Sequence, residues 1–360
     1  MGQGISIVIP VHNGAAYLDA CPQAVHDLRP APVECIVVDD GSTDSSAEIA
    51  REAGATVIAT PGRRGPAYAR NLGAARARCE VLLFVDADVV VPPDALARIA
   101  ARFAEDPARD AVIGSYDREP ASPGLFSQYR NLLHCYTHQL GQARTCGFWT
   151  GCGAIRAAVF RAQGGFDEEH ARPRIEDLEL GSRLRQAGRQ VWLDKGLQVK
   201  HLKRLRLWGM VKTDVLDRAI PWTRLILRSR RMPADLNLRW GQRFSVLASG
   251  GAALALVLSA VCAAFSEAGW AAALALFAAA AAFAVAVLNR GFYRFLARVR
   301  SPWFALCAFP LHYVYFLCGG AGFAAGLAAH ECGVWRRRFF PPEPPAGQPI
   351  PANPTRNLSE

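Results

Sequence analysis

The sequence predicts an α/β domain built on a mostly parallel sheet flanked by helices, followed by an α-helical membrane region. Two observations predict this organisation. Short β-branched runs alternate with helix-like stretches over the first 115 residues, and long uncharged apolar stretches dominate from residue 244 onward. Alternating strands and helices favour a parallel sheet covered on both faces, whereas apolar stretches of about 20 residues are typical of membrane spans.

Five apolar runs in the first half are predicted strands. They occupy residues 5–9, 34–38, 56–59, 81–85 and 111–114. Nearly every residue in them is apolar, as is typical of strands buried on both faces. A longer helical stretch from about residue 122, a Gly-rich segment at 147–153 and a helix at 175–187 follow, and we interpret them as part of the same domain, residues 1–200.

Positive charge is concentrated in one stretch. The formal net charge is +10, and twelve Lys and Arg lie between residues 200 and 243 against three Asp. This pattern predicts basic amphipathic helices over residues 201–243 that lie in a membrane interface, where each basic residue gains about 1 kcal/mol near anionic lipid. Nucleic acid is the alternative partner for such a stretch. Its position beside apolar runs favours an anionic bilayer surface as the partner, and we expect the protein to bind no nucleic acid.

The membrane region is predicted over residues 244–335. Residues 244–265 and 270–288 carry no charge, and each run is long enough to cross a hydrocarbon core of about 30 Å. Residues 303–329 form a third apolar run. Since basic segments precede residue 244 and follow residue 289, the first two runs satisfy the positive-inside rule as a hairpin. We expect a disordered tail over residues 336–360.

The third run leaves two topologies open. A full crossing would put Arg336, Arg337 and Arg338 on the far side of the membrane, against the charge rule. Alternatively the chain enters and returns on one face, broken at Pro310 and at the glycines 319 and 320, which requires shielding of the backbone by protein. We expect three spans, because one apolar run of this length crosses without special shielding.

The cysteines and the start of the chain bear on location. Ten cysteines show no paired metal-type spacing, so we interpret them as buried thiols in a reducing compartment. A strand begins at residue 5, and we therefore expect no signal peptide. These features predict an integral protein of a bacterial inner (cytoplasmic) membrane whose N-terminal domain faces the cytoplasm.

Acidic residues follow two of the predicted strands. Asp39 and Asp40 come directly after the second strand, and Asp86 and Asp88 come after the fourth. Ligands bind at the carboxyl ends of strands in an open parallel sheet, so these carboxylates could hold a nucleoside and a cation. Mg²⁺ and Mn²⁺ sites typically use one or two carboxylates together with phosphate oxygens. Either pair alone could equally belong to an ordinary turn.

A third acidic cluster opens the helix at residues 175–187. Asp177 lies in its first turn, where the helix dipole favours the ionised form, and apolar neighbours could hold the side chain rigidly. A rigid carboxylate can accept the proton of an attacking hydroxyl. Taken alone, the cluster could also be an exposed acidic first turn.

Taken together, these motifs resemble the family 2 glycosyltransferases, which are inverting enzymes of the Rossmann-like GT-A fold. The resemblance covers about residues 4–203. Its motifs in order are Pro10-x-x-Asn13, Asp39-Asp40-Gly41-Ser42, Ala69-Arg70-Asn71-Leu72-Gly73, Asp86-Ala87-Asp88, Gly151-Cys152-Gly153-Ala154 with Gly164-Gly165-Phe166-Asp167, and Glu176-Asp177.

The resemblance implies a role for each motif. It implies that Asp177, with Glu176, supplies the catalytic base, and that Asp86 and Asp88 bind the diphosphate and a divalent Mn²⁺ or Mg²⁺. The donor would be a nucleotide diphosphate sugar, either a UDP-sugar or a GDP-sugar. The implied nucleotide site comprises Pro10, Asn13, Asp39, Asp40, Arg70 and Asp86, and the implied acceptor site includes Gly151, Cys152 and Gly153.

One departure from the family pattern concerns the segment after the base. Processive members carry Q-x-x-R-W there, whereas this chain has Arg218-Ala219-Ile220-Pro221-Trp222. We expect Arg218 to face the diphosphate and Trp222 to lie under the acceptor. The missing Gln and the few spans argue against a polymer-exporting synthase.

The apolar spans predict a membrane lipid acceptor. A polyprenyl phosphate is already an anion and needs little help from a base, whereas a hydroxyl does need one. We therefore favour a hydroxyl of a lipid or lipid-linked glycan, with a polyprenyl phosphate as the alternative. A non-catalytic scaffold that binds nucleotide sugar is a further alternative, and it would not need all three acidic motifs.

Overall fold

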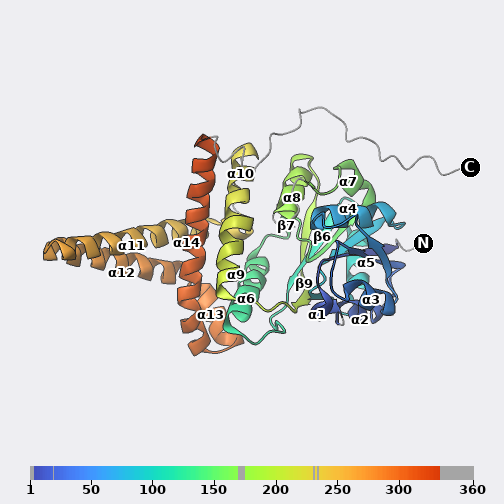
Figure 1. Cartoon of the computed structure of the whole chain (residues 1–360), viewed down its shortest axis with the longest axis horizontal. Coiled ribbons are helices and arrows are strands. Elements are labelled where there is room, and N and C mark those ends of the chain that lie inside the picture. The colour runs from blue at the N-terminus through green and yellow to red at the C-terminus, as the bar shows by residue number, and fades with distance from the viewer. Residues whose placement is uncertain (1–3, 19, 169–174, 230–231, 233–234, 333–360) are drawn as a thin grey trace, which may run out of the picture.

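The structure is a computed structural model, and it describes residues 4–18, 20–168, 175–229, 232 and 235–332. The predicted disordered tail falls outside these residues. Within them, an α/β half at the N-terminus is followed by a helical half, and the two pack against each other (Figure 1).

One nine-stranded sheet forms the centre of the α/β half, and its strands lie in the order β3-β2-β1-β4-β8-β6-β9-β5, with β7 paired to β9. The strand bounds are β1 Ile5–Val11, β2 Glu34–Asp39, β3 Thr56–Ala59, β4 Val81–Val85, β5 Val89–Val90, β6 Ala111–Tyr116, β7 Arg144–Thr145, β8 Cys152–Arg156 and β9 Val191–His201. All five predicted strands are present, and the predicted α/β class with its membrane-compatible helices is confirmed.

The sheet is parallel in one half and mixed in the other. Strands β1, β2, β3 and β4 run parallel, whereas β8 runs antiparallel to both β4 and β6. Apolar side chains pack on both faces of the parallel half. The carboxyl ends of β1, β2 and β4 therefore meet at one edge, where the polar motifs begin.

Helices flank this sheet. Their bounds are α1 Ala15–Leu18, α2 Ala20–His26, α3 Ser46–Glu52, α4 Pro66–Arg76, α5 Ala95–Glu105, α6 Leu125–Leu140, α7 Ala157–Ala162 and α8 Glu176–Gln186. Helix α8 begins one residue after the predicted start at residue 175. Its first turn carries the acidic cluster to the polar edge of the sheet.

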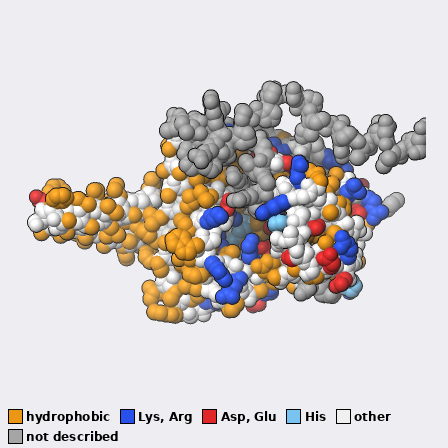
Figure 2. All heavy atoms as spheres, viewed as in Figure 1, with side chains coloured by type: hydrophobic (Ala, Val, Ile, Leu, Met, Phe, Trp, Pro, Cys, Tyr) orange, Lys and Arg blue, Asp and Glu red, His pale blue; other side chains and the backbone are white. Residues whose placement is uncertain are grey.

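The basic segment and the apolar runs form the helical half. Its elements are α9 Leu207–Lys212, the π-helix η1 Thr213–Ala219, α10 Ile220–Ser229, the 3-10 helix η2 Leu236–Leu238, α11 Trp240–Ala264, α12 Ala268–Leu288, α13 Arg290–Val299 and α14 Pro302–Cys332. By length and composition, α11, α12 and α14 could each cross a membrane. Hydrophobic side chains cover the hairpin of α11 and α12, and Lys and Arg gather nearer the α/β half (Figure 2).

Helix α14 is oriented differently from the hairpin. It runs across the base of α11 and α12 and along α10, whereas the hairpin projects away from the α/β half (Figure 1). It is a single helix that includes Pro310, so the break at Pro310 or at Gly319 and Gly320 that the alternative topology requires does not occur. That α14 crosses the bilayer stays a prediction.

Two glycines set the close approach of α14 to the basic segment. A Cβ at Gly322 would lie 2.4 Å from the Ala219 Cβ in η1, and one at Gly326 would lie 2.8 Å from the Thr223 Cβ in α10. Any larger side chain would push the helices apart. The glycines therefore fix η1 and α10 between the membrane-compatible helices and the sheet.

Candidate active site

The Arg70 guanidinium joins two of the acidic motifs. From α4 it donates one hydrogen bond to Asp86 Oδ1 at 2.7 Å and one to Glu176 Oε1 at 3.0 Å, and it is only 4% exposed. Such charge-assisted bonds are strong and directional. Arg70 thus fixes the start of α8 against the end of β4, and acidic motifs 90 residues apart in the sequence converge on one cation.

The first two motifs meet at the ends of β1 and β2. Asn13 Oδ1 accepts hydrogen bonds from the backbone N–H of Thr43 at 2.8 Å and from its hydroxyl at 3.3 Å, and the Asn13 N–H donates to Ser42 Oγ at 3.0 Å. Asp39 uses Oδ1 to accept the Ser42 N–H. Pro10 lies within β1, directly beside β2. The predicted nucleotide residues of both strands are therefore brought together.

Asp40 differs from Asp39 in how its carboxylate is used. Its two oxygens accept the backbone N–H groups of Arg64 at 2.7 Å and Gly65 at 2.8 Å, and a bond from Thr60 Oγ1 at 3.1 Å, and the residue is 4% exposed. The side chain thus orders the loop that leads into α4. Of the two predicted nucleoside residues, Asp39 is the less committed to the protein.

Asp88 faces two nitrogen-bearing side chains, one from β9 and one from the segment that follows it. His201 Nε2 lies 3.5 Å from Asp88 Oδ2, and Lys203 Nζ lies 3.8 Å from the same oxygen. Burial alone would raise the pKa of Asp88, but its bond to His201 and the nearby charges lower it below the ordinary value. The carboxylate is therefore ionised.

Asn131 orients the His201 ring. Its Oδ1 lies 2.8 Å from His201 Nδ1, and its own Nδ2 donates to the Ser127 carbonyl at 2.9 Å. Since this amide oxygen can only accept, Nδ1 carries the proton. Nε2 is then the ring nitrogen that faces the Asp88 carboxylate and the one that a cation between the two groups would use.

Asp177 lines a cavity of about 150 Å³ between α8, α10 and η2. Burial, followed by repulsion from Glu176, raises the pKa of Asp177 from its ordinary 3.8 to about 7, although the positive charge of Arg218 opposes the shift. Among the described residues, the Leu178 N–H, 2.7 Å from Oδ1, is the one hydrogen-bond donor to this carboxylate. The geometry leaves its other oxygen available to a group in the cavity.

Aromatic side chains form the opposite wall of the cavity. The rings of His134 and Trp149 lie 4.7 Å apart, and those of His134 and His138 lie 4.0 Å apart. Burial lowers the pKa of His138 to about 4 and that of His134 well below its ordinary value. Both rings are therefore neutral near pH 7, and the wall is an uncharged aromatic surface.

The predicted acceptor glycines lie behind this wall rather than in it. A Cβ at Gly151 would lie 2.3 Å from the Trp149 ring, and one at Gly153 would lie 2.4 Å from the Trp149 carbonyl. Cys152 is fully buried in β8, and burial raises its thiol pKa to about 12. These residues leave room for Trp149, which itself lines the cavity.

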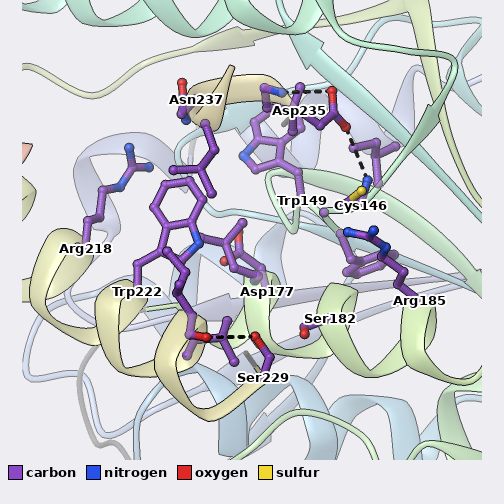
Figure 3. Close-up of a pocket in the computed structure, with 18 of the residues that line it drawn as sticks. Cys146, Trp149, Asp177, Ser182, Arg185, Arg218, Trp222, Ser229, Asp235 and Asn237 are labelled. Atoms are coloured by element: carbon purple, nitrogen blue, oxygen red, sulfur yellow. Dashed lines mark hydrogen bonds between the residues drawn. The ribbon is translucent and has the colours of Figure 1, made fainter. Parts of the chain in front are cut away.

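Arg218 and Trp222 lie on the side of the cavity that faces α11 and α14. Trp222 stands between Arg218 and Asp177 (Figure 3). Arg218 belongs to η1, and π-helical turns often occur at functional sites. Among the described residues Arg218 has no hydrogen-bond or ion-pair partner. It is therefore a cation that lies across Trp222 from Asp177 and is available to an anionic ligand.

Several residues of the site were not predicted from the sequence. They are His134, His138, Trp149, His201 and Asp235. Of these, His201 could have been predicted from the sequence, since it ends a strand at the edge where the acidic motifs lie. Asp235 accepts from Thr145 Oγ1 at 2.9 Å and holds η2 over the cavity.

Comparison with known proteins agrees with this geometry. The sequence profile of the family "Glycosyl transferase family 2" matches residues 6–163. The chain is 33% identical over 134 residues to "Glycosyltransferase GlyG" of Streptococcus pneumoniae. The aligned stretch covers 36% of this chain and 44% of that protein. It is 28% identical to "Pre-mycofactocin glycosyltransferase" of Mycobacterium tuberculosis over 84% of this chain and 64% of that protein.

A solved structure shares the fold. The mannosyltransferase PcManGT of Pyrobaculum calidifontis, solved with GDP-Man and Mn²⁺, superposes with a TM-score of 0.54 at 17% identity, over 93% of this chain and 88% of that one. This likeness shows the GT-A fold. The chain spans less than half the length of the first three curated relatives that it matches.

Proposed function

We propose that this protein, whose residues 6–163 match the profile of the family 2 glycosyltransferases, is a membrane-bound inverting glycosyltransferase. It moves a sugar from a nucleotide diphosphate sugar to a hydroxyl of a lipid or of a lipid-linked glycan. The observation that carries this proposal is the Asp177 carboxyl, which lies in a cavity lined by aromatic side chains and has a pKa raised to about 7.

Asp177 acts as the general base in this proposal. A base works best when its pKa lies near the working pH, since it is then ionised and still basic enough to take a hydroxyl proton. Burial brings Asp177 to that range. An attacking hydroxyl in the cavity would lose its proton to the carboxylate as its oxygen bonds to the anomeric carbon, and the nucleoside diphosphate would leave from the opposite face.

The donor site is proposed at the ends of β1, β2 and β4. Asp39 and Asn13 contact the nucleoside, while Asp40 shapes the loop before α4. Arg70 orients Asp86 and Glu176 beside the diphosphate. Arg218, which has no partner among the described residues, supplies a further cation on the acceptor side of the diphosphate.

The residues at Asp88 fit a divalent Mn²⁺ or Mg²⁺. The Asp88 carboxylate and the Nε2 lone pair of His201 would hold the ion, with Asp86 nearby. Across the described residues, no three His, Cys, Asp or Glu side chains form a complete metal cage. Phosphate oxygens of the donor would complete such a site, as is usual for Mg²⁺. When bound, the ion would neutralise charge on the departing diphosphate.

The helical half anchors the enzyme in this proposal. The α11–α12 hairpin crosses the bilayer, and both of its ends return to the side of the α/β half, next to the Arg-rich α13. The positive-inside rule then puts the catalytic half in the cytoplasm, and a bacterial inner membrane suits this arrangement. An acceptor embedded in that membrane would reach the cavity from the side of α10 that faces α11 and α14.

A direct test compares wild type with Asp177→Asn in membranes that contain a lipid extract. The assay measures release of the nucleoside diphosphate from a panel of UDP- and GDP-sugars with and without Mn²⁺, and mass spectrometry identifies the glycosylated lipid. Wild type should transfer sugar, and Asp177→Asn should lose at least 100-fold of the rate, within the usual range for a general base. Asp94→Asn, at a 62% exposed carboxylate, is the matched control.

Two results would overturn the proposal. Binding of nucleotide sugar with no turnover on any donor would favour a non-catalytic scaffold. Full activity of Asp177→Asn with a lipid phosphate as the only productive acceptor would favour a polyprenyl-phosphate glycosyltransferase, because an anionic acceptor needs no base.

A further inference from the structure

We call the cavity lined by Asp177 the acceptor cavity, and a second cavity lies beside it, toward α11 and α14. It measures about 280 Å³ and is bounded by η1, α10, α11 and α14. We call it the tail groove. Its lining includes Val246 and Leu247 from α11 and Phe316 and Phe323 from α14.

The tail groove continues directly from the acceptor cavity. The residues that line both are Arg218, Trp222, Ile226, Asn237 and Leu238. A ligand could therefore occupy both cavities at once, with Trp222 standing at their junction. Asp177 lies on the far side of Trp222 from Arg218 (Figure 3).

Polarity changes along this continuous space. Polar groups of the acceptor cavity include Asp177, Arg185 and Asp235, whereas α11 and α14 contribute mainly apolar side chains to the tail groove. Of its charged residues, Asp214 is engaged by Arg130, and Arg243 donates to the Leu238 carbonyl at 2.8 Å. The groove thus offers an apolar path that ends at the Arg218 guanidinium, which has no hydrogen-bond or ion-pair partner among the described residues.

The tail groove also reaches the outer surface of the apolar hairpin. Leu247 lines it and is 70% exposed, on a helix long and apolar enough to span a membrane. A hydrocarbon chain that passes from the bilayer into the groove exchanges one apolar environment for another and never meets water. A wholly polar acceptor would gain nothing from such a path.

We propose that the tail groove binds the hydrocarbon chain of the lipid acceptor, an inference that rests on the proposed function. The chain enters between α11 and α14, the polar head passes Trp222, and its hydroxyl reaches Asp177. The groove thereby selects acceptors that carry a long apolar chain.

Gly319 offers a way to fill the tail groove without disturbing the backbone. It lines the groove, and a Cβ there would lie 3.8 Å from Val246 Cγ2, which is ordinary contact. Gly319→Leu therefore puts a branched side chain into the groove. Gly250→Leu is the matched control, because a Cβ at that α11 position meets nothing within 4 Å. Leu247→Trp is a second blocking variant at an exposed position.

The test uses a long-chain alcohol with a diazirine at the end of its chain, in vesicles that hold the full-length protein. After irradiation, mass spectrometry maps the cross-links. We expect them at Val246, Leu247 and Phe323 in wild type and in Gly250→Leu, and at least tenfold fewer there in Gly319→Leu or Leu247→Trp. Equal labelling in all variants, or labelling confined to the outer face of α12 at Leu276 and Phe283, overturns the proposal.

An activity measurement separates this inference from the proposed function. Gly319→Leu should lose transfer to the lipid extract but keep wild-type hydrolysis of the donor, since the proposed donor residues at the ends of β1, β2 and β4 lie outside the groove. Cross-linking requires no turnover, so it decides the role of the groove even for a protein that transfers no sugar. Transfer by Gly319→Leu at the wild-type rate to long-chain acceptors would exclude the groove as their path.

Discussion

The His201 imidazole lies with Nε2 3.5 Å from Asp88 Oδ2, at the carboxyl edge of the sheet. The two groups come from elements 113 residues apart in the sequence, and Asn131 fixes the ring by its contact with Nδ1 at 2.8 Å. The proposed metal site can therefore be tested through Asn131, which would touch neither the metal nor the substrate.

Asn131→Ala should weaken Mn²⁺ binding by about 10–100-fold, the usual cost of losing a group that orients a metal ligand. Without the amide oxygen, His201 can rotate and present either nitrogen. The measurement is Mn²⁺ titration followed by electron paramagnetic resonance in the presence of UDP or GDP. The exposed His26→Ala serves as control, and an unchanged Mn²⁺ affinity in Asn131→Ala would remove His201 from the site.

The rate of transfer should depend on pH through Asp177. Because its pKa is raised to about 7 and the ionised form is the base, kcat/KM should fall roughly tenfold per pH unit below 7 and level off above it. A pH–rate profile from pH 5 to 9 measures this. A flat profile across that range would count against Asp177 as the base.

The Asp177 carboxylate should also lower the stability of the folded protein at high pH. Its folded pKa lies above the ordinary 3.8, so the folded state binds more protons between about pH 4 and pH 7, and stability is lost as pH rises through that window. Asp177→Asn should therefore have a higher Tm than wild type at pH 8 and little advantage at pH 4. Thermal unfolding at the two pH values tests this, and a lower Tm at pH 8 contradicts it.

Arg218→Ala should reduce sugar transfer without changing the melting temperature. The side chain is exposed and has no hydrogen-bond or ion-pair partner among the described residues, so its removal breaks no such contact there. A loss of 10-fold or more in kcat/KM is expected for a charge that meets the diphosphate, at about 1.4 kcal/mol per factor of ten. Arg78→Ala, at a 76% exposed side chain, is the matched control. Unchanged turnover would reject a role for Arg218.

The buried pair of Arg130 and Asp214 should hold η1 against α6. Arg130 donates to both carboxylate oxygens, with Nη1 at 3.1 Å from Oδ2. Arg130→Met alone should cost about 3–5 kcal/mol, because it leaves a buried carboxylate unpaired. The double variant Arg130→Met with Asp214→Leu should recover most of that loss. Urea unfolding measures both, and a double variant no more stable than the single one would show that the pair itself is required.

Gly322→Ala should destabilise the protein by about 1–3 kcal/mol, the usual range for overpacking, since its Cβ would lie 2.4 Å from Ala219 Cβ. Gly250→Ala is the control, because space at that position is open. Thermal unfolding compares the two. Equal stability of both variants would mean that α14 can shift from η1 at no cost.

Sequence periodicity and turn chemistry were enough to predict the α/β half. Buried strands such as residues 81–85 are apolar throughout, and this local pattern survives folding unchanged. The location of the acidic motifs could be predicted equally well, because polar residues that directly follow a buried strand must lie at a sheet edge. The convergence of Asp86 and Glu176 on Arg70 agrees with that reasoning.

Tertiary structure decided the rest. No local pattern could put His201 beside Asp88, make Asp40 a loop anchor, or seat Trp149 over Gly151, because each contact joins elements through sheet order or close packing. The sequence by itself determined which groups carry charge and which segments avoid water. Only the packing of η1, α10 and α14 decided how the acceptor cavity opens toward the apolar helices, since that depends on glycines 322 and 326 admitting a helix at contact distance.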